Sequence, residues 1–270
     1  MPVAAVRYAQ VPPWDSYAAR RGKLATDNLR QMLMRKLKGE MGVHAQTLLC
    51  AVGALAGFAA QNAALEQGEI LARRRDLVAP RSLLLFTTPK GRRYLFGSWV
   101  NAPLLAGYGH AAPLQRFLIE AGERAGMEPG DAPDFKALEA RLSTGVTASG
   151  FGVLKAPRGH APAAQPGELL KTLWPQARRI LTAPLPLQFP HEPPLSEAHW
   201  PALLSSLAGR LVSTTSDKLN PRIGMMLVME SAIIASRLDP DSVDPGRWNV
   251  APTRGGLSIT RGEQLRLANA

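Results

Sequence analysis

Cysteine is almost absent from this chain, because Cys50 is the only one among 270 residues. A single cysteine forms no internal disulfide and leaves no multi-cysteine zinc site, so disulfide-stapled folds and zinc fingers are both excluded. Aromatic residues are also few, at 6%, which argues against an extended platform for stacking bases. Apolar residues make up 46% of the chain, which is sufficient for the hydrophobic core of one large domain or two small ones.

The common signatures of nucleophilic catalysis and of phosphate binding are also missing. There is no GxSxG nucleophile elbow and no GxxxxGK(S/T) phosphate loop, and the glycine-rich stretch 145–155 lacks the third glycine of the dinucleotide fingerprint. Four possible metal ligands fall close together, but their spacing matches no metal-binding motif: His191, Glu192, Glu197 and His199. We therefore expect no metal ion and no cofactor.

A secretory signal is absent as well, since residues 1–11 lack a basic segment followed by an apolar one. The expected location is the cytoplasm. One feature favours a membrane instead, because residues 47–60 are almost continuously apolar and follow a basic segment at 35–38. However, half of these residues are alanine or glycine, and polar residues flank the run. We therefore expect a buried helix of a soluble protein and no membrane partner.

Basic residues outnumber acidic residues by 32 to 21, which gives a formal net charge of +11. Such a charge favours anionic partners, such as nucleic acid or another polyanion. The basic residues gather around 20–38 and 73–93, and from these clusters we select the candidate anion-binding residues Arg35, Lys38, Arg92 and Arg93. Two alternatives remain: the basic helix near residue 35 rests on anionic lipid, or the charge reflects only an arginine-rich composition.

Hydrophobic periodicity predicts a mainly helical α+β protein. The expected helices cover residues 25–38, 43–67, 113–125, 133–142, 168–181, 201–215 and 220–238. The last helix is apolar on almost all sides and begins with the cap Asn220 followed by Pro221, so we place it at the centre of the core. In the second helix, Gly53 and Gly57 allow another backbone to approach closely.

One small antiparallel sheet is expected among these helices. The segments 82–88 and 92–98 have the composition of strands, and the turn at 89–91 joins them into a hairpin over about 82–98. Two strands alone are marginal in water, so Gly150–Ala156 is the expected third strand.

The segment 157–167 has almost no core-forming residues and is the best candidate for a linker. It would separate a lobe at 1–156, built from an antiparallel pair of the first two helices and the hairpin, from a helical lobe at 168–270. Alternatively, the chain is a single domain in which 157–167 is a long loop.

Two residues are candidates for acid–base chemistry. Glu230 is the only charged residue in the middle of the most apolar helix, so its carboxyl is either a perturbed acid or base or one half of a structural ion pair. His110 lies in a loop containing glycine and proline, where functional side chains often gather. The same region supplies the expected ligand surface, formed by Trp99, Asn101 and Tyr108. We expect Cys50 to be an inert core thiol.

No segment of the sequence reaches a specific catalytic or binding signature. We interpret the chain as a non-enzymatic interaction or regulatory protein that has a basic, nucleic-acid-binding surface and self-associates through apolar helix surface. The alternative is an enzyme that acts on a small anionic substrate, with Glu230 or His110 as the acid or base. Steep salt dependence would indicate the first, and a concave pocket holding a perturbed carboxyl would indicate the second.

Overall fold

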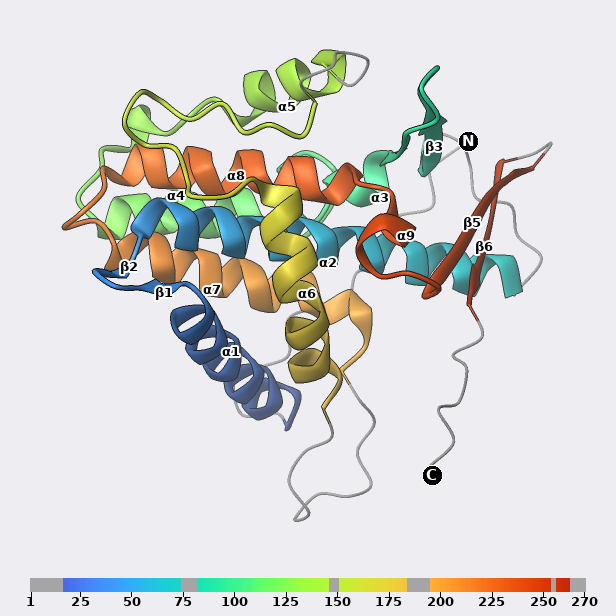
Figure 1. Ribbon diagram of the computed structural model, residues 1–270, viewed down its shortest axis with the longest axis horizontal. Helices are drawn as coiled ribbons and strands as arrows, with labels where there is room; N and C mark the ends of the chain where they lie inside the picture. Colours follow the sequence, from blue (N-terminus) through green and yellow to red (C-terminus); the bar gives the residue numbers. More distant parts are fainter. Residues whose placement is uncertain (1–16, 74–81, 146–150, 184–194, 254–255, 263–270) are drawn as a thin grey trace.

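The computed structural model describes residues 17–73, 82–145, 151–183, 195–253 and 256–262 (Figure 1). Helices dominate the described chain and are joined by small antiparallel hairpins, which confirms the predicted α+β, mainly helical class. The α-helices are α1 (Tyr17–Lys36), α2 (Ala45–Arg73), α3 (Ser98–Asn101), α4 (Leu114–Arg124), α5 (Phe135–Thr144), α6 (Pro166–Thr182), α7 (Trp200–Thr214), α8 (Pro221–Arg237) and α9 (Pro240–Val243). Two 3-10 turns are η1 (Pro129–Asp131) and η3 (Glu197–His199).

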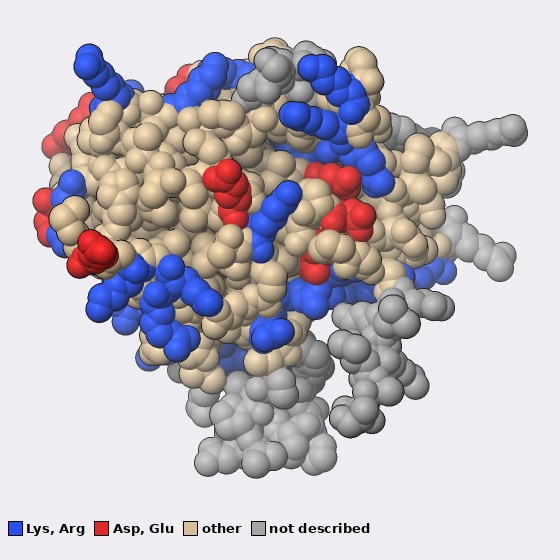
Figure 2. All heavy atoms as spheres, viewed as in Figure 1, with Lys and Arg blue, Asp and Glu red and all other residues tan. Residues whose placement is uncertain are grey.

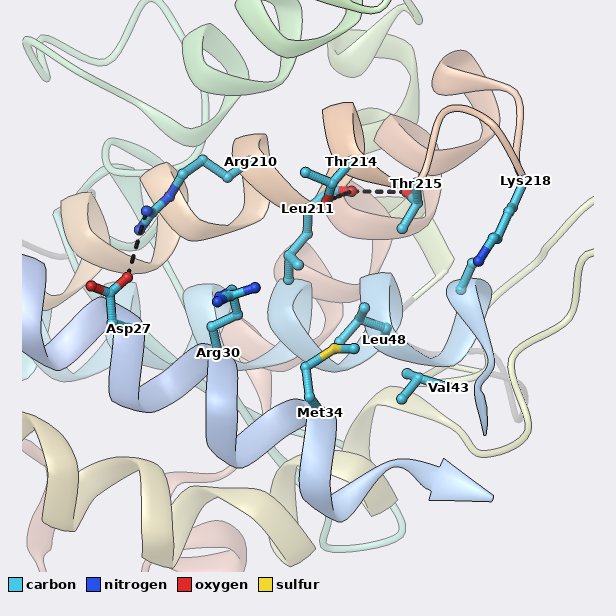
Figure 3. A pocket seen from close by; sticks show the side chains of 11 residues that line it. Asp27, Arg30, Met34, Val43, Leu48, Arg210, Leu211, Thr214, Thr215 and Lys218 are labelled. Carbon is cyan, nitrogen blue, oxygen red and sulfur yellow. Dashed lines mark hydrogen bonds and ion pairs between the residues drawn. The ribbon is translucent and has the colours of Figure 1, made fainter. Parts of the chain in front are cut away.

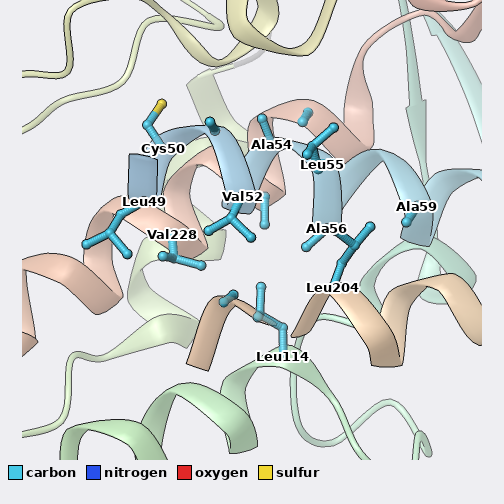
Figure 4. Close-up of a cluster of buried hydrophobic side chains, with 14 of the residues drawn as sticks. Leu49, Cys50, Val52, Ala54, Leu55, Ala56, Ala59, Leu114, Leu204 and Val228 are labelled. Atoms are coloured by element: carbon cyan, nitrogen blue, oxygen red, sulfur yellow. The ribbon is translucent and has the colours of Figure 1, made fainter. Parts of the chain in front are cut away.

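Helix α2 lies at the centre of the molecule. Every residue from Thr47 to Leu65 is buried, and α6, α7 and α8 pack around the helix. Side chains of α2 meet Val228 of α8, Leu204 of α7 and Leu114 of α4 in one hydrophobic cluster (Figure 4). By length and composition, α2 could also cross a membrane, but its most apolar stretch is completely buried inside the protein. This burial fits the core helix of a soluble protein.

Helix α8 is the main partner of α2. A Cβ atom added to Gly53 would overlap the carbonyl oxygen of Val228, and one added to Gly57 would overlap that of Ala232. The two backbones are therefore in direct contact, as the small residues predict. At the start of α8, the Asn220 side chain accepts a hydrogen bond from the Arg222 N–H at 2.9 Å, which confirms the predicted cap.

The expected pairing of the first two helices with each other describes only part of the packing of α1, which also contacts α6 and α7. Helix α1 packs more extensively on α6 and α7 than on α2, because its buried residues Leu29, Met32 and Leu33 belong to the core shared by all of these helices. The chain then reverses through a short hairpin, β1 (Lys38–Gly39) and β2 (Gly42–Val43), before α2 begins.

The predicted hairpin forms, with β3 (Leu84–Thr87) paired to β4 (Arg93–Phe96). Gly91 has a φ of 75° in the connecting turn, a conformation that favours glycine. The expected third strand at 150–156 is wrong for its described residues 151–156. Side chains satisfy their backbone N–H groups instead of a neighbouring strand: Leu154 N–H donates to Gln165 at 2.9 Å and Lys155 N–H to Glu230 at 3.0 Å.

A further hairpin follows α8, formed by β5 (Trp248–Thr253) and β6 (Gly256–Arg261). Its inward residues, including Trp248 and Ile259, join Leu95 and Trp99 in a second hydrophobic cluster beside the C-terminal part of α2. The first cluster contains residues from both sides of segment 157–167. The division of the chain into two lobes at this segment stays a prediction.

Candidate anion-binding site

Helix α1 has six basic residues and a single acidic residue, Asp27. One side of the helix is buried in the core, and the other side is exposed to solvent. We call its exposed cations, together with the one that follows in β1, the α1 basic face: Lys23, Arg30, Arg35, Lys36 and Lys38. In Figure 2, Lys and Arg side chains form a group over α1.

The cations of the α1 basic face are not neutralised by neighbours. Within the described ranges, no carboxylate forms an ion pair with any of the five, whereas arginines elsewhere are paired, such as Arg73 with Glu69 at 2.8 Å. Exposed cations without a paired carboxylate are available to an anionic ligand, although salt screens the attraction. The predicted residues Arg35 and Lys38 both belong to this face.

A pocket of about 440 Å³ opens beside the α1 basic face, between α1, the start of α2 and the end of α7 (Figure 3). We call it the α1–α7 pocket. Apolar side chains form one part of its lining: Met34, Val43, Leu48 and Leu211. Cations from three segments form another part, namely Arg30 of α1, Arg210 of α7 and Lys218 of the loop after α7.

The pocket is electropositive. Its lining contains three cations and one carboxylate, Asp27, a balance of +2. Arg210 lies 3.8 Å from the Asp27 carboxylate, and both side chains are about half exposed, so this ion pair is a weak one. The Thr215 hydroxyl donates to the Leu211 carbonyl at 2.8 Å and therefore faces a ligand as an acceptor. The cations are the donors available to an anion.

The structure does not bring Arg92 and Arg93 to the same surface. Strand β1 lies toward one end of the long axis and the β3–β4 hairpin toward the other (Figure 1). Arg92 is exposed near the hairpin turn. Arg93 joins two hairpins, because its guanidinium donates to the Val250 carbonyl at 3.0 Å and lies 3.7 Å from Asp239. Arg93 is thus part of the scaffold.

Glu230 is buried and has two structural partners. One carboxylate oxygen accepts the Lys155 N–H at 3.0 Å, and the other forms an ion pair with Arg141 at 3.0 Å. His110 Nδ1 accepts the Ala112 N–H at 3.1 Å, and burial lowers the pKa of this imidazole. Neither residue lines the α1–α7 pocket.

The expected ligand surface near residue 100 is divided. Trp99 is buried in the second hydrophobic cluster, whereas Tyr108 is exposed. Asn101 donates to the Glu139 carboxylate at 3.4 Å, and the same oxygen accepts from Arg237 at 3.0 Å. Arg237 is 1% exposed, and its burial lowers the pKa of the guanidinium. This buried arginine was not anticipated from the sequence, although it ends the apolar helix that contains Glu230.

Cys50 is buried on α2, and Ser231 donates a hydrogen bond to its sulfur at 3.2 Å. Burial raises the pKa of this thiol to about 11. We expect less than a tenth of Cys50 to react with iodoacetamide at pH 8 in the native protein, because the thiolate is the nucleophile. Mass spectrometry should show complete alkylation in denaturant. Stoichiometric alkylation without denaturant would contradict the burial of this thiol.

A partly buried ion cluster fastens the β5–β6 hairpin to α2 and η3. Arg247 forms an ion pair with Glu197, and Arg261 contacts Glu197 at 3.0 Å and Glu69 at 2.8 Å. Glu66 lies 3.5 Å from Arg261 on the same side. We call these five residues the hairpin ion cluster. Sequence reasoning missed it, because its members are separated along the chain and share no motif.

The carboxyl groups of this cluster respond differently to their surroundings. Burial alone would raise the pKa of Glu69, but hydrogen bonds from Arg261 and Arg73 outweigh it and hold the pKa below its ordinary value. The stabilisation from Glu69 is therefore present above the ordinary carboxyl pKa and is lost as the pH falls through the lowered value. Burial raises the pKa of Glu197 despite the nearby Arg247 and Arg261. Titration of this carboxyl therefore makes the folded protein less stable, not more stable, as the pH rises through the carboxyl range.

The four possible metal ligands at 191–199 do not form a metal site in the described part of the chain. His191 and Glu192 lie outside the described residues, and Glu197 belongs to the hairpin ion cluster. Among the residues that the structure describes, no three His, Cys, Asp or Glu side chains are placed to hold a metal ion.

Comparison of the chain with protein-family models, with curated proteins and with solved structures gave no match. The case for the candidate site is therefore made from its geometry. The α1 basic face and the α1–α7 pocket share Arg30 and form one continuous cationic region.

Proposed function

We propose that this chain is a cytoplasmic, non-enzymatic interaction protein that binds nucleic acid through the α1 basic face. The observation that carries the proposal is the set of exposed cations on α1 and β1 with no ion-paired carboxylate among the described residues. Lys and Arg that contact phosphates release condensed counterions, which supplies binding without sequence specificity. Phosphate contacts by themselves carry no sequence information, so we expect little sequence preference.

The dimensions of this face suit a phosphate backbone. Lys23 and Arg30 are seven residues apart on α1, which is about 10.5 Å along a helix axis and almost two full turns, so both side chains leave the same side of the helix. Phosphates on one strand of a duplex rise by about 3.4 Å each, so this part of the helix spans about three of them. Lys38 extends the face beyond the helix end.

Binding is favoured over the enzyme alternative by the partners of the two candidate catalytic residues. Glu230 is held by Arg141 and the Lys155 N–H, and His110 by the Ala112 N–H. An acid or base must reach a substrate proton within hydrogen-bond distance, and both residues lie outside the α1–α7 pocket.

The variant R35E/K38E tests the proposal. Fluorescence anisotropy would measure binding to labelled single-stranded and duplex oligonucleotides between about 50 and 200 mM salt. We expect wild-type affinity to fall steeply over this range, with a log–log slope of about −3 to −4 for four phosphate contacts. In R35E/K38E, affinity should fall at least about tenfold. The magnitude of the log–log slope should decrease by about 2, because two phosphate contacts are removed.

The matched control is K90E/R92E, which makes the same change in net charge at the opposite end of the molecule. Both control residues are exposed, and Arg93 is spared because it joins two hairpins. Affinity of the control should stay within about threefold of wild type, since charges beyond a Debye length of about 10 Å are screened. An equal loss in both variants, or binding to phosphatidylserine vesicles without binding to oligonucleotides, would overturn the proposal.

A further inference from the structure

We propose that the α1–α7 pocket binds a nucleotide that has a terminal phosphomonoester, with the phosphate held by Arg30 and Arg210. This inference rests on the proposed function, because it identifies which part of a nucleic acid the cationic region recognises. The phosphomonoester has two possible sources, the phosphorylated end of a strand and a free mononucleotide.

The charge of the pocket favours a phosphomonoester over the phosphodiesters inside a strand. Three cations and Asp27 give the lining a balance of +2. A phosphomonoester has a charge of about −1.5 to −2 at pH 7 and three acceptor oxygens, whereas each backbone phosphodiester has a single negative charge. The terminal group therefore matches the pocket in charge, and an internal phosphate leaves part of the positive charge uncompensated.

The donors can reach one ligand from different directions. Arg30 extends from α1 toward α7, and Arg210 extends from α7 toward α1 (Figure 3). Arginine forms paired, charge-assisted hydrogen bonds with phosphate oxygens. The competing partner of Arg210, the Asp27 carboxylate at 3.8 Å, is beyond normal hydrogen-bond distance. A dianion at this point gives Arg210 a stronger partner than the one it has.

The apolar part of the lining favours a nucleotide over phosphate alone. Met34 is 40% exposed and offers a surface for the flat face of a base, whereas Leu48 and Leu211 are 4% and 5% exposed and add little to it. Methionine adapts its shape to aromatic surfaces. The volume of about 440 Å³ falls in the range of small-molecule sites, about 300–1,000 Å³. Since Arg30 also belongs to the α1 basic face, a strand bound there can end in this pocket.

The experiment compares one oligonucleotide sequence with a 5′-phosphate, with a 3′-phosphate and with hydroxyl groups at both ends, by fluorescence anisotropy. Equilibrium dialysis of a nucleoside 5′-monophosphate, the same nucleoside and inorganic phosphate tests the free ligands. We expect a terminal phosphate to increase wild-type affinity about tenfold, as two charge-assisted contacts would. In R210Q/K218Q this preference should disappear, while the hydroxyl-ended oligonucleotide still binds within about threefold of wild type.

The variant K90Q/R92Q is the matched control, because it removes two exposed cations at the other end of the molecule and should keep the preference. A phosphate preference only in oligonucleotides identifies the strand end as the source, and retention of the monophosphate over the nucleoside identifies the free nucleotide. If phosphorylated and hydroxyl-ended strands bind equally and the monophosphate is not retained, the pocket inference is overturned. The proposed function then still stands, provided that R35E/K38E weakens oligonucleotide binding.

Discussion

Replacement of Gly57 by alanine is expected to lower the free energy of unfolding by about 3 kcal/mol. The new Cβ atom would overlap the Ala232 carbonyl oxygen and lie against its backbone carbons, and a backbone in the middle of α8 has no flexible end that can turn aside. The helices must separate to accept the methyl group, which disturbs packing along the most extensive helix contact in the molecule. This loss exceeds the gain of about 1 kcal/mol that alanine brings to a helix interior. Urea unfolding followed by circular dichroism would measure the change.

Gly167→Ala is the matched control for this substitution. Gly167 also lies in a helix, α6, but a Cβ atom there would meet only the Leu238 side chain at 3.6 Å, an ordinary packing distance. We expect Gly167→Ala to be neutral or to stabilise the protein by up to about 1 kcal/mol. Equal stabilities of Gly57→Ala and Gly167→Ala would show that α2 and α8 are not in backbone contact.

Replacement of Glu197 by methionine is expected to lower the free energy of unfolding by about 3 kcal/mol. Arg247 is 9% exposed and pairs with Glu197, and its other carboxylate neighbour is Asp244 at 3.9 Å. Without Glu197, the Arg247 guanidinium remains buried with poor compensation for its charge. Arg261 is affected less, because Glu69 stays at 2.8 Å. Thermal and urea unfolding would measure the loss.

The double variant E197M/R247M separates this explanation from a simple loss of packing. Replacing both partners of a buried ion pair by apolar residues is often nearly neutral, whereas removing one partner leaves an uncompensated charge. We therefore expect E197M/R247M to be more stable than E197M. The single variant R247M completes the cycle. If the loss of stability in E197M/R247M equals the sum of the losses in E197M and R247M, the two side chains are not coupled.

The seven longer helices were predictable from the sequence, most from a periodic apolar pattern and α8 from its cap and its nearly continuous apolar composition. The sequence did not predict which helices pack against each other. Gly53 and Gly57 indicated a close backbone contact, yet nothing near them in the sequence identified α8 as the partner. The strand expected at 150–156 failed for a related reason, since the backbone of Leu154 and Lys155 is satisfied by the distant side chains of Gln165 and Glu230. Local composition does not contain such contacts.

The candidate site was predictable only in its local part. Arg35 and Lys38 lie close together in the sequence and on the surface, so charge clustering was sufficient to find them. Arg210 and Lys218 were missed because they reach the pocket from α7 and its following loop. The sequence also did not distinguish Arg92, which is exposed, from Arg93. The guanidinium of Arg93 donates to the Val250 carbonyl and lies near the Asp239 carboxylate.

The contact between α2 and α8 has a consequence for synthesis of the chain. Gln61 of α2 donates to the Ser236 carbonyl at the end of α8, across a separation of 175 residues. At a synthesis rate of about 5–20 residues per second, roughly 10–35 s pass between the two segments. Throughout that interval α2 lacks its main partner, although its hydropathy is that of a membrane-spanning helix. During this interval the apolar surface of α2 is available for aggregation or for contact with a membrane.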